Sequence, residues 1–189
     1  MRRTPLLFLG ILLVAGCSDP IPTSSATTHE PQAASALSSA FAASSSVENR
    51  DLATLRAATA RFQRFDVAKD AGYTYLFMNM CMEDNGPASA GGMGYHYVNT
   101  SLLDAKVDVS TPEALLYEPG PNGQLHLVAV EYVIPKAAWT STQPPMLFGQ
   151  TFKLNAFDLW ALHVWVWDNN PSGMYADWNP RVSCANATP

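Results

Sequence analysis

Charged side chains are scarce in this sequence. Lys, Arg, Asp and Glu make up 14% of the 189 residues, against about 25% in a typical globular protein. The balance is acidic, with 11 basic and 16 acidic residues and a formal net charge of −5. Binding to nucleic acid requires clustered Lys and Arg that displace counterions. We therefore expect no nucleic-acid partner, and the length suits one domain of ordinary size.

Several motifs of catalysis and nucleotide binding are also missing. The chain contains no GxxxxGK[ST] phosphate loop, no GxSxG nucleophile elbow and no HExxH metal motif. Gly91, Gly92 and Gly94 precede a predicted strand, whereas the glycines of a Rossmann phosphate loop follow one. Nucleotide binding and hydrolysis by a serine triad are therefore not expected.

The N-terminus has the pattern of a secretory signal. Two arginines precede an apolar run over residues 6–15, which is too short to span a bilayer as a helix of roughly 20 residues. The run ends in Val14-Ala15-Gly16-Cys17, which resembles the lipobox of bacterial lipoproteins. That resemblance implies that residues 1–16 are a signal peptide and that Cys17 is lipidated.

An exported protein is therefore expected, with the membrane as its partner through the N-terminal lipid. Its place is the cell envelope, at the outer membrane if the organism has one. An ordinary signal peptide with an incidental cysteine is the alternative.

The next two regions differ in composition. Residues 18–44 are mostly Ser, Ala, Thr and Pro and offer little apolar surface to offset the entropy of ordering, so 17–44 is expected to be a lipidated cysteine and a flexible tether. Ser45 and Glu48 match a capping box. Beyond them, apolar residues at three- and seven-residue spacings predict an amphipathic helix over 46–70, ended by Gly72: Leu52, Leu55, Phe62 and Phe65.

Residues 45–189 are expected to form a single globular domain that is β-rich after Gly72. Apolar and β-branched runs predict strands near 95–98, 113–118, 124–134, 146–154 and 159–168. The turn residues at 119–123 join two of these strands in an antiparallel hairpin. The sequence thus predicts an α+β fold: one long N-terminal amphipathic helix packed on a mostly antiparallel sheet that curls towards a barrel.

The three cysteines divide into one anchor and one pair. Export permits disulfides, and once Cys17 is lipidated only Cys81 and Cys184 remain. We predict that these two pair. The alternative makes them metal ligands, although neither has a second cysteine at CxxC spacing.

Two imidazoles and one carboxylate are the candidate metal ligands. His163 lies in a predicted strand that is apolar on both faces, and His96 follows the glycine-rich loop. Glu131 lies in another apolar strand, where an unpaired carboxylate is costly to bury; strand alternation puts it on one face with Leu127, Ala129 and Val133.

Brought together in one sheet, His96, Glu131 and His163 suit a divalent transition metal, with Zn or Fe the usual occupants. His126 is left out, because it lies an odd number of residues from Glu131. Two alternatives stay open: a hydrogen-bonded core pair of His163 and Glu131, and metal-free acid–base chemistry by Glu131 and a histidine.

Aromatic residues near the C-terminus suggest a ligand pocket. Trp165 and Trp167 share the predicted strand face of His163 and, with Tyr97 and Gln150, form the candidate pocket. Tryptophans in strands are equally typical of an ordinary core. A further alternative is a soft copper(I) site, or gap-filling core side chains, made by the methionines that flank Cys81: Met78, Met80, Met82 and Met93.

These features predict an exported, lipid-anchored envelope protein that binds a divalent metal or a small ligand in a His/Glu pocket of its sheet. One alternative is a metal-dependent or acid–base enzyme that uses the same residues. Another is a structural envelope lipoprotein without a small-molecule site.

Overall fold

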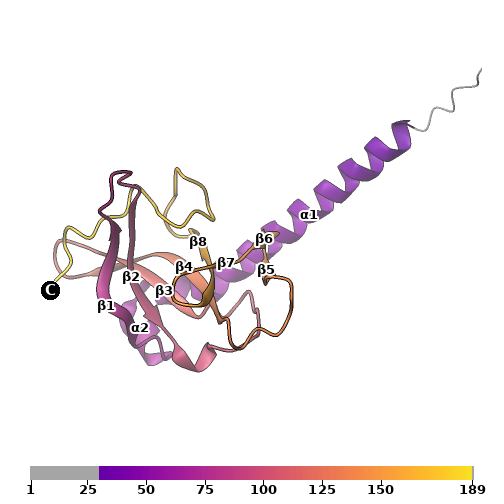
Figure 1. The fold of residues 1–189 in the computed structure, drawn as a ribbon. Coiled ribbons are helices and arrows are strands. Elements are labelled where there is room, and N and C mark those ends of the chain that lie inside the picture. The colour runs from indigo at the N-terminus through magenta and orange to yellow at the C-terminus, as the bar shows by residue number, and fades with distance from the viewer. Residues whose placement is uncertain (1–29, 189) are drawn as a thin grey trace, which may run out of the picture.

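A computed structural model describes residues 30–188 of the chain (Figure 1). A helical segment comes first, made of α1 (Glu30–Thr59), the 3-10 turn η1 (Ala60–Gln63) and α2 (Phe65–Asp70). The remainder holds the 3-10 turn η2 (Thr100–Leu102) and eight strands: β1 (Tyr75–Asp84), β2 (Gly91–Val98), β3 (Ala114–Pro119), β4 (Leu125–Pro135), β5 (Met146–Leu147), β6 (Gln150–Thr151), β7 (Lys153–Leu154) and β8 (Leu159–Val164). The predicted signal peptide and lipobox, with Cys17, lie outside the described residues.

Helix α1 begins at Glu30, so residues 30–44 of the expected tether are helical. Four alanines over 36–43 give a reason, because alanine has the highest helix propensity. This part of α1 projects beyond the body (Figure 1), and on it Leu37 and Phe41 are 60% and 71% exposed. None of the helices described is long and apolar enough to cross a membrane.

The single helix predicted over this region is divided after Thr59. Arg64 is extended, with φ −94° and ψ 110°, and separates η1 from α2. The Thr59 hydroxyl donates to the Leu55 carbonyl at 2.8 Å, and such back-bonding bends helices. The change of direction brings both Phe62 and Phe65 to the core.

Gly72 ends α2, as predicted. Its φ is +98°, its N–H donates to the Lys69 carbonyl at 2.9 Å, and the Tyr73 N–H donates to the Ala68 carbonyl at 3.1 Å. This pair of bonds is a Schellman motif, whose left-handed residue is usually glycine. The sheet begins three residues later, at Tyr75.

The main sheet has the strand order β1-β2-β3-β4-β8-β7, and all of its described neighbours pair antiparallel. It curves into half a barrel (Figure 1), while β5 and β6 form a separate pair. The predicted α+β class is confirmed. Strand β1 is not predicted by the sequence pattern, because its pairing with β2 skips from Leu76 to Cys81 and both Met78 and Asn79 have positive φ.

The sheet separates two cores. The helical segment covers one face, where Leu55, Leu115, Tyr117, Tyr132 and Val164 belong to the larger cluster. The opposite face holds a smaller cluster that includes Val98, Ala114, Leu116, Ala129 and Trp165. The helix and the buried His/Glu group described below therefore lie on opposite faces of the same strands.

A register shift in the β3–β4 pairing changes which face each residue of β4 occupies. The shift falls between Leu116 and Tyr117, and it puts both Val128 and Ala129 in the smaller cluster while Leu127 joins the larger one. The predicted alternation along β4 therefore holds only from residue 129 onward. Leu127 does not share the face of Glu131.

Cys81 and Cys184 form a disulfide, as predicted, with their Cα atoms 5.8 Å apart. The bond ties β1 to the C-terminal segment across a sequence separation of 103 residues. The chain-entropy model assigns the closure of a loop of this length about 4.7 kcal/mol. Beside the bond, the Cys184 N–H donates to a Glu83 carboxylate oxygen at 3.2 Å.

Candidate metal centre

The sheet brings His96, Glu131 and His163 together on the face away from the helix. Glu131 in β4 and His163 in β8 are direct cross-strand partners. His96 lies in β2, which β3 separates from β4, so the two backbones are about 9–10 Å apart. On β3 the partner of Glu131 is Ala114, whose small side chain leaves room for the imidazole and the carboxylate to meet over it.

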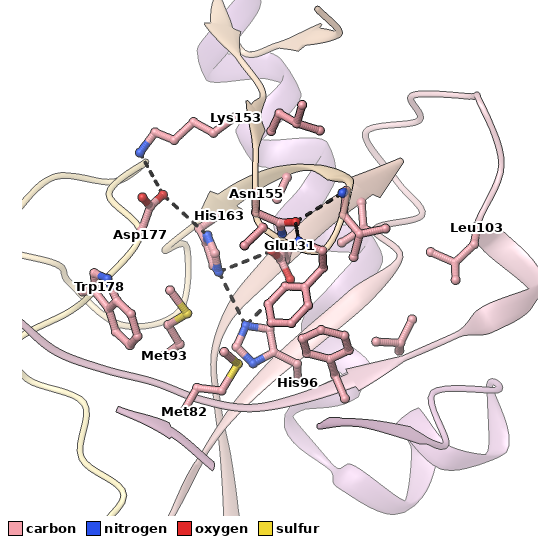
Figure 2. A pocket seen from close by; sticks show the side chains of 18 of the residues that line it. Met82, Met93, His96, Leu103, Glu131, Lys153, Asn155, His163, Asp177 and Trp178 are labelled. Carbon is pink, nitrogen blue, oxygen red and sulfur yellow. Dashed lines mark hydrogen bonds and ion pairs between the residues drawn. The ribbon is translucent and has the colours of Figure 1, made fainter. Parts of the chain in front are cut away.

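The three side chains point toward one another (Figure 2). The Nε2 atoms of His96 and His163 are 3.5 Å apart. Glu131 presents one carboxylate oxygen to each of them, at 3.7 Å from His96 Nε2 and 3.5 Å from His163 Nε2. All three residues are buried, with exposures of 3%, 8% and 6% in chain order.

These separations are too long for good hydrogen bonds and match those of ligands around one metal ion. Hydrogen bonds between such atoms are usually 2.7–3.2 Å long, about half an ångström shorter than the contacts here. Two ligand atoms that each lie about 2.1 Å from one metal ion, the usual distance from Zn²⁺ to nitrogen or carboxylate oxygen, are about 3.4 Å apart in tetrahedral geometry, close to each of these contacts. The group can therefore hold a metal ion.

Burial keeps the three groups neutral in the metal-free protein. It raises the pKa of Glu131 to about 8, assisted by the negative charges of Asp177 and Glu113. It lowers the pKa of His96 to about 3, with a further contribution from His163. It also lowers the pKa of His163 to about 4, with the charge of Lys153 adding to the effect. At neutral pH both imidazoles therefore have a free lone pair to offer, and the carboxyl holds a proton that a metal displaces.

Asp177 and Lys153 lie behind His163. An Asp177 carboxylate oxygen is 3.9 Å from His163 Nδ1 and accepts a hydrogen bond from Lys153 Nζ at 2.8 Å. A carboxylate beside the outer nitrogen of a metal-bound imidazole commonly orients the ring. On the other side, His96 Nδ1 has no hydrogen-bond partner of normal geometry among the described residues, and an interaction with the Gly94 backbone partly opposes the lowering of the His96 pKa by burial.

A cavity of about 510 Å³ opens beside the three residues. Its size falls in the range of pockets for small molecules. Its wall is mostly apolar, with side chains from β1, β2, η2–β3 and the β7–β8 hairpin: Phe77, Met82, Met93, Leu103, Phe157 and Leu159. Figure 2 shows Met82 and Met93 on the His96 and His163 side of this cavity.

The edges of the curved sheet meet across this cavity through two phenylalanines. Phe77 comes from the irregular part of β1, and Phe157 comes from the turn between β7 and β8. Their rings pack edge to face, with centres 5.1 Å apart and an angle of 88° between the planes. Since β1 and β7 are the two edge strands, this contact joins the two ends of the half-barrel.

None of the four predicted pocket residues lines this cavity. Trp165 is buried beside it, and its indole N–H donates to the Ala176 carbonyl at 2.7 Å. Trp167 and Tyr97 pack on the helix-side core, and Gln150 lies in β6 near α1. Two physical reasons account for the difference: regular β8 ends before Trp165, and Tyr97 follows His96 and so faces the other way.

The sequence pattern also does not predict that Phe77 and Phe157 line the cavity, and the reason is again irregular backbone. Phe77 precedes Met78, and Phe157 precedes Asp158, and both of these following residues have positive φ. A period of two residues predicts side-chain direction only along regular strand backbone. His126, which alternation excluded, is exposed at the β3–β4 turn and lies outside the cavity.

Similarity to other proteins does not identify a family for this chain. No family model, no curated protein and no solved structure matches it. What the site can do therefore follows from its own atoms: two imidazole nitrogens and a carboxylate, facing an apolar cavity.

Proposed function

We propose that the protein binds one divalent transition-metal ion through His96 Nε2, His163 Nε2 and the Glu131 carboxylate, and that this ion binds a small molecule in the adjoining cavity. The observation behind the proposal is the spacing of the three donor groups, 3.5–3.7 Å from one another. Three protein ligands leave coordination positions open, as in catalytic rather than structural metal sites. His96, Glu131 and His163 line the cavity, so an ion held by them would be accessible to a molecule in it.

A set of two imidazoles and one carboxylate suits Zn²⁺ and Fe²⁺. With Zn²⁺ the centre polarises a bound oxygen or activates water, and with Fe²⁺ it binds small oxygen-donor molecules and dioxygen. The protein contributes the donor atoms, the dry surroundings and the carboxylate of Asp177 behind His163.

A simple core pair explains the group less well. A carboxyl and an imidazole that merely satisfy each other approach to about 2.7–3.0 Å, whereas His163 Nε2 and Glu131 Oε1 stay 3.5 Å apart. A second candidate function is acid–base catalysis without a metal. It is favoured by one observation: burial raises the pKa of Glu131 to about 8, so that this carboxyl can donate and accept a proton near neutral pH.

We also propose that the protein is exported and anchored to the membrane through lipidated Cys17. The basis is the resemblance of Val14-Ala15-Gly16-Cys17 to a lipobox, and the Cys81–Cys184 disulfide is consistent with an oxidising compartment. Cys17→Ser should move the protein from the membrane fraction to the soluble fraction. Retention in the membrane would contradict the anchor.

The metal proposal is tested by elemental analysis of the untagged full chain, purified in detergent without chelators. We expect about one transition-metal ion per chain, and less than about a tenth of that in His163→Ala. His126→Ala is the matched control, because His126 is an exposed histidine outside the cavity, and it should keep the full metal content. Equal metal in all three proteins, or none in the parent, would contradict the proposal.

A further inference from the structure

The cavity beside the proposed metal has few charged groups. Among the described residues that line it, Lys153 and Asp177 are the charged pair, and their 2.8 Å contact balances one charge against the other. The remaining charged group is the Glu131 carboxylate, once it is a metal ligand. A divalent ion with this single carboxylate and two neutral imidazoles keeps one uncompensated positive charge.

That positive charge sits among apolar side chains, where water does not screen it well. Electrostatic interactions strengthen as the surrounding dielectric constant falls, and an isolated charge in apolar surroundings is costly. An anionic oxygen donor in the open coordination position removes this cost. A neutral donor of the same shape leaves the charge in place.

Part of the cavity wall is aromatic. Phe77 and Phe157 pack against each other and line it, and Phe157 remains 48% exposed. Trp178 and Leu159 line the same space. Aromatic rings favour an aromatic ligand through edge-to-face and offset stacked contacts, which add to the effect of burial.

We infer that the cavity takes a small organic monoanion that binds the metal through a carboxylate or phenolate oxygen and packs an aromatic body against Phe77 and Phe157. This inference rests on the proposed metal site and adds the class of ligand. It follows from the single net charge, the apolar wall and the aromatic pair taken together. Short anions such as acetate lack the aromatic group, and neutral aromatic alcohols lack the negative charge, so we expect both to bind more weakly.

The test is a titration of the Co²⁺-loaded full chain, whose visible absorption reports a ligand that enters the coordination sphere. Three probes test separately the need for a negative charge and the need for an aromatic group: 3-phenylpropionate, its neutral analogue 3-phenylpropan-1-ol, and acetate. We expect 3-phenylpropionate to bind at least tenfold more tightly than either of the others. Equal affinities, or tighter binding of the alcohol, would overturn the inference while leaving metal binding intact.

Phe157→Ala tests the aromatic part. Phe157 is about half exposed and is not one of the proposed metal ligands, so its removal should leave the Co²⁺ content unchanged even though it loosens the contact between the sheet edges. The affinity for 3-phenylpropionate should fall about three- to tenfold, in line with the loss of one aromatic contact, and that for acetate should not change. Phe41→Ala is the control, because Phe41 is exposed on the projecting part of α1.

The experiments distinguish failure of the proposed metal site from failure of the inferred ligand class. If Phe157→Ala binds 3-phenylpropionate as tightly as the parent does, the aromatic part of the inference is wrong. If the parent chain binds no Co²⁺, the proposed metal site is wrong and the ligand class falls with it. A loaded centre that prefers no probe overturns only the ligand class.

Discussion

Two groups of buried polar side chains, on opposite faces of the same sheet, differ in how they are paired. On the helix side, the hydroxyls of Tyr73, Tyr117 and Tyr132 each donate to a backbone carbonyl at 2.7 Å. On the other side, the polar atoms of His96, Glu131 and His163 stop 3.5–3.7 Å from one another beside a cavity of about 510 Å³.

The comparison distinguishes buried polar groups that stabilise the fold from a group that we propose binds a metal. Buried polar groups in proteins are nearly all hydrogen-bonded, and an exception needs a reason. The tyrosines are satisfied by the chain itself, so they stabilise the fold. The His/Glu group has only longer contacts among the described residues, and its spacing fits the metal ion that we propose.

The largest expected effect is stabilisation by the metal. Zn²⁺ at a thousand times its dissociation constant should raise the free energy of unfolding by about 4 kcal/mol, because it binds only the folded chain. Glu131→Gln removes the carboxylate ligand and should abolish this increase. Thermal or urea unfolding with and without Zn²⁺ measures it, and an equal increase in both proteins would place the metal elsewhere.

Removal of a buried tyrosine hydroxyl on the helix side should lower the free energy of unfolding. Tyr117→Phe leaves the buried Phe62 carbonyl without its donor, which should lower the free energy of unfolding by about 1–3 kcal/mol. Metal content should stay at one ion per chain, because Tyr117 lies on the other face. Loss of the metal in this variant would show that the two faces are not independent.

The metal affinity should depend on pH through a single proton. Burial raises the pKa of Glu131 to about 8, so below pH 8 the metal must displace its proton, and affinity should fall about tenfold for each pH unit. His96 and His163, with pKa values lowered to about 3 and 4, add no further protons above about pH 5. Competition with a chelator of known pH dependence gives the slope, and a slope of two or more between pH 5 and 7 would contradict buried neutral imidazoles.

The smallest effect should come from removing an imidazole in the metal-free protein. His96 Nδ1 already has no partner among the described residues, and its Nε2 makes only long contacts. His96→Leu should therefore change the free energy of unfolding by less than about 1 kcal/mol, or raise it, since replacing an unsatisfied polar group by an apolar one is close to neutral. A loss as large as that of Tyr117→Phe would remove the contrast between the two faces.

The sequence predicts which residues carry the chemistry better than it predicts how they are arranged. Glu131 and His163 stand out because each interrupts an apolar strand, and burying a polar group in such a place needs a partner. Their direct pairing across β4 and β8 depends on register, which comes from long-range contacts that a local pattern does not contain. The disulfide is predictable because the lipobox resemblance leaves two cysteines.

Irregular backbone accounts for most of the differences. The register shift beside Tyr117 moves Leu127 to the helix side, and after β8 ends at Val164 the chain places Trp167 on the helix side too. Phe77 lies where the pairing of β1 with β2 is interrupted, and local alternation in the sequence does not predict such an interruption. Of these three irregularities, only the break at Phe77 contributes to the cavity wall.

The most direct test is a crystal structure of the protein soaked with Zn²⁺, with anomalous scattering measured at the zinc edge. We predict one strong peak about 2.1 Å from His96 Nε2, His163 Nε2 and a Glu131 oxygen, the usual Zn–ligand distance. Absence of a peak there, with the same three side chains drawn together into hydrogen bonds of about 2.8 Å, would contradict the metal site and assign the group to the core.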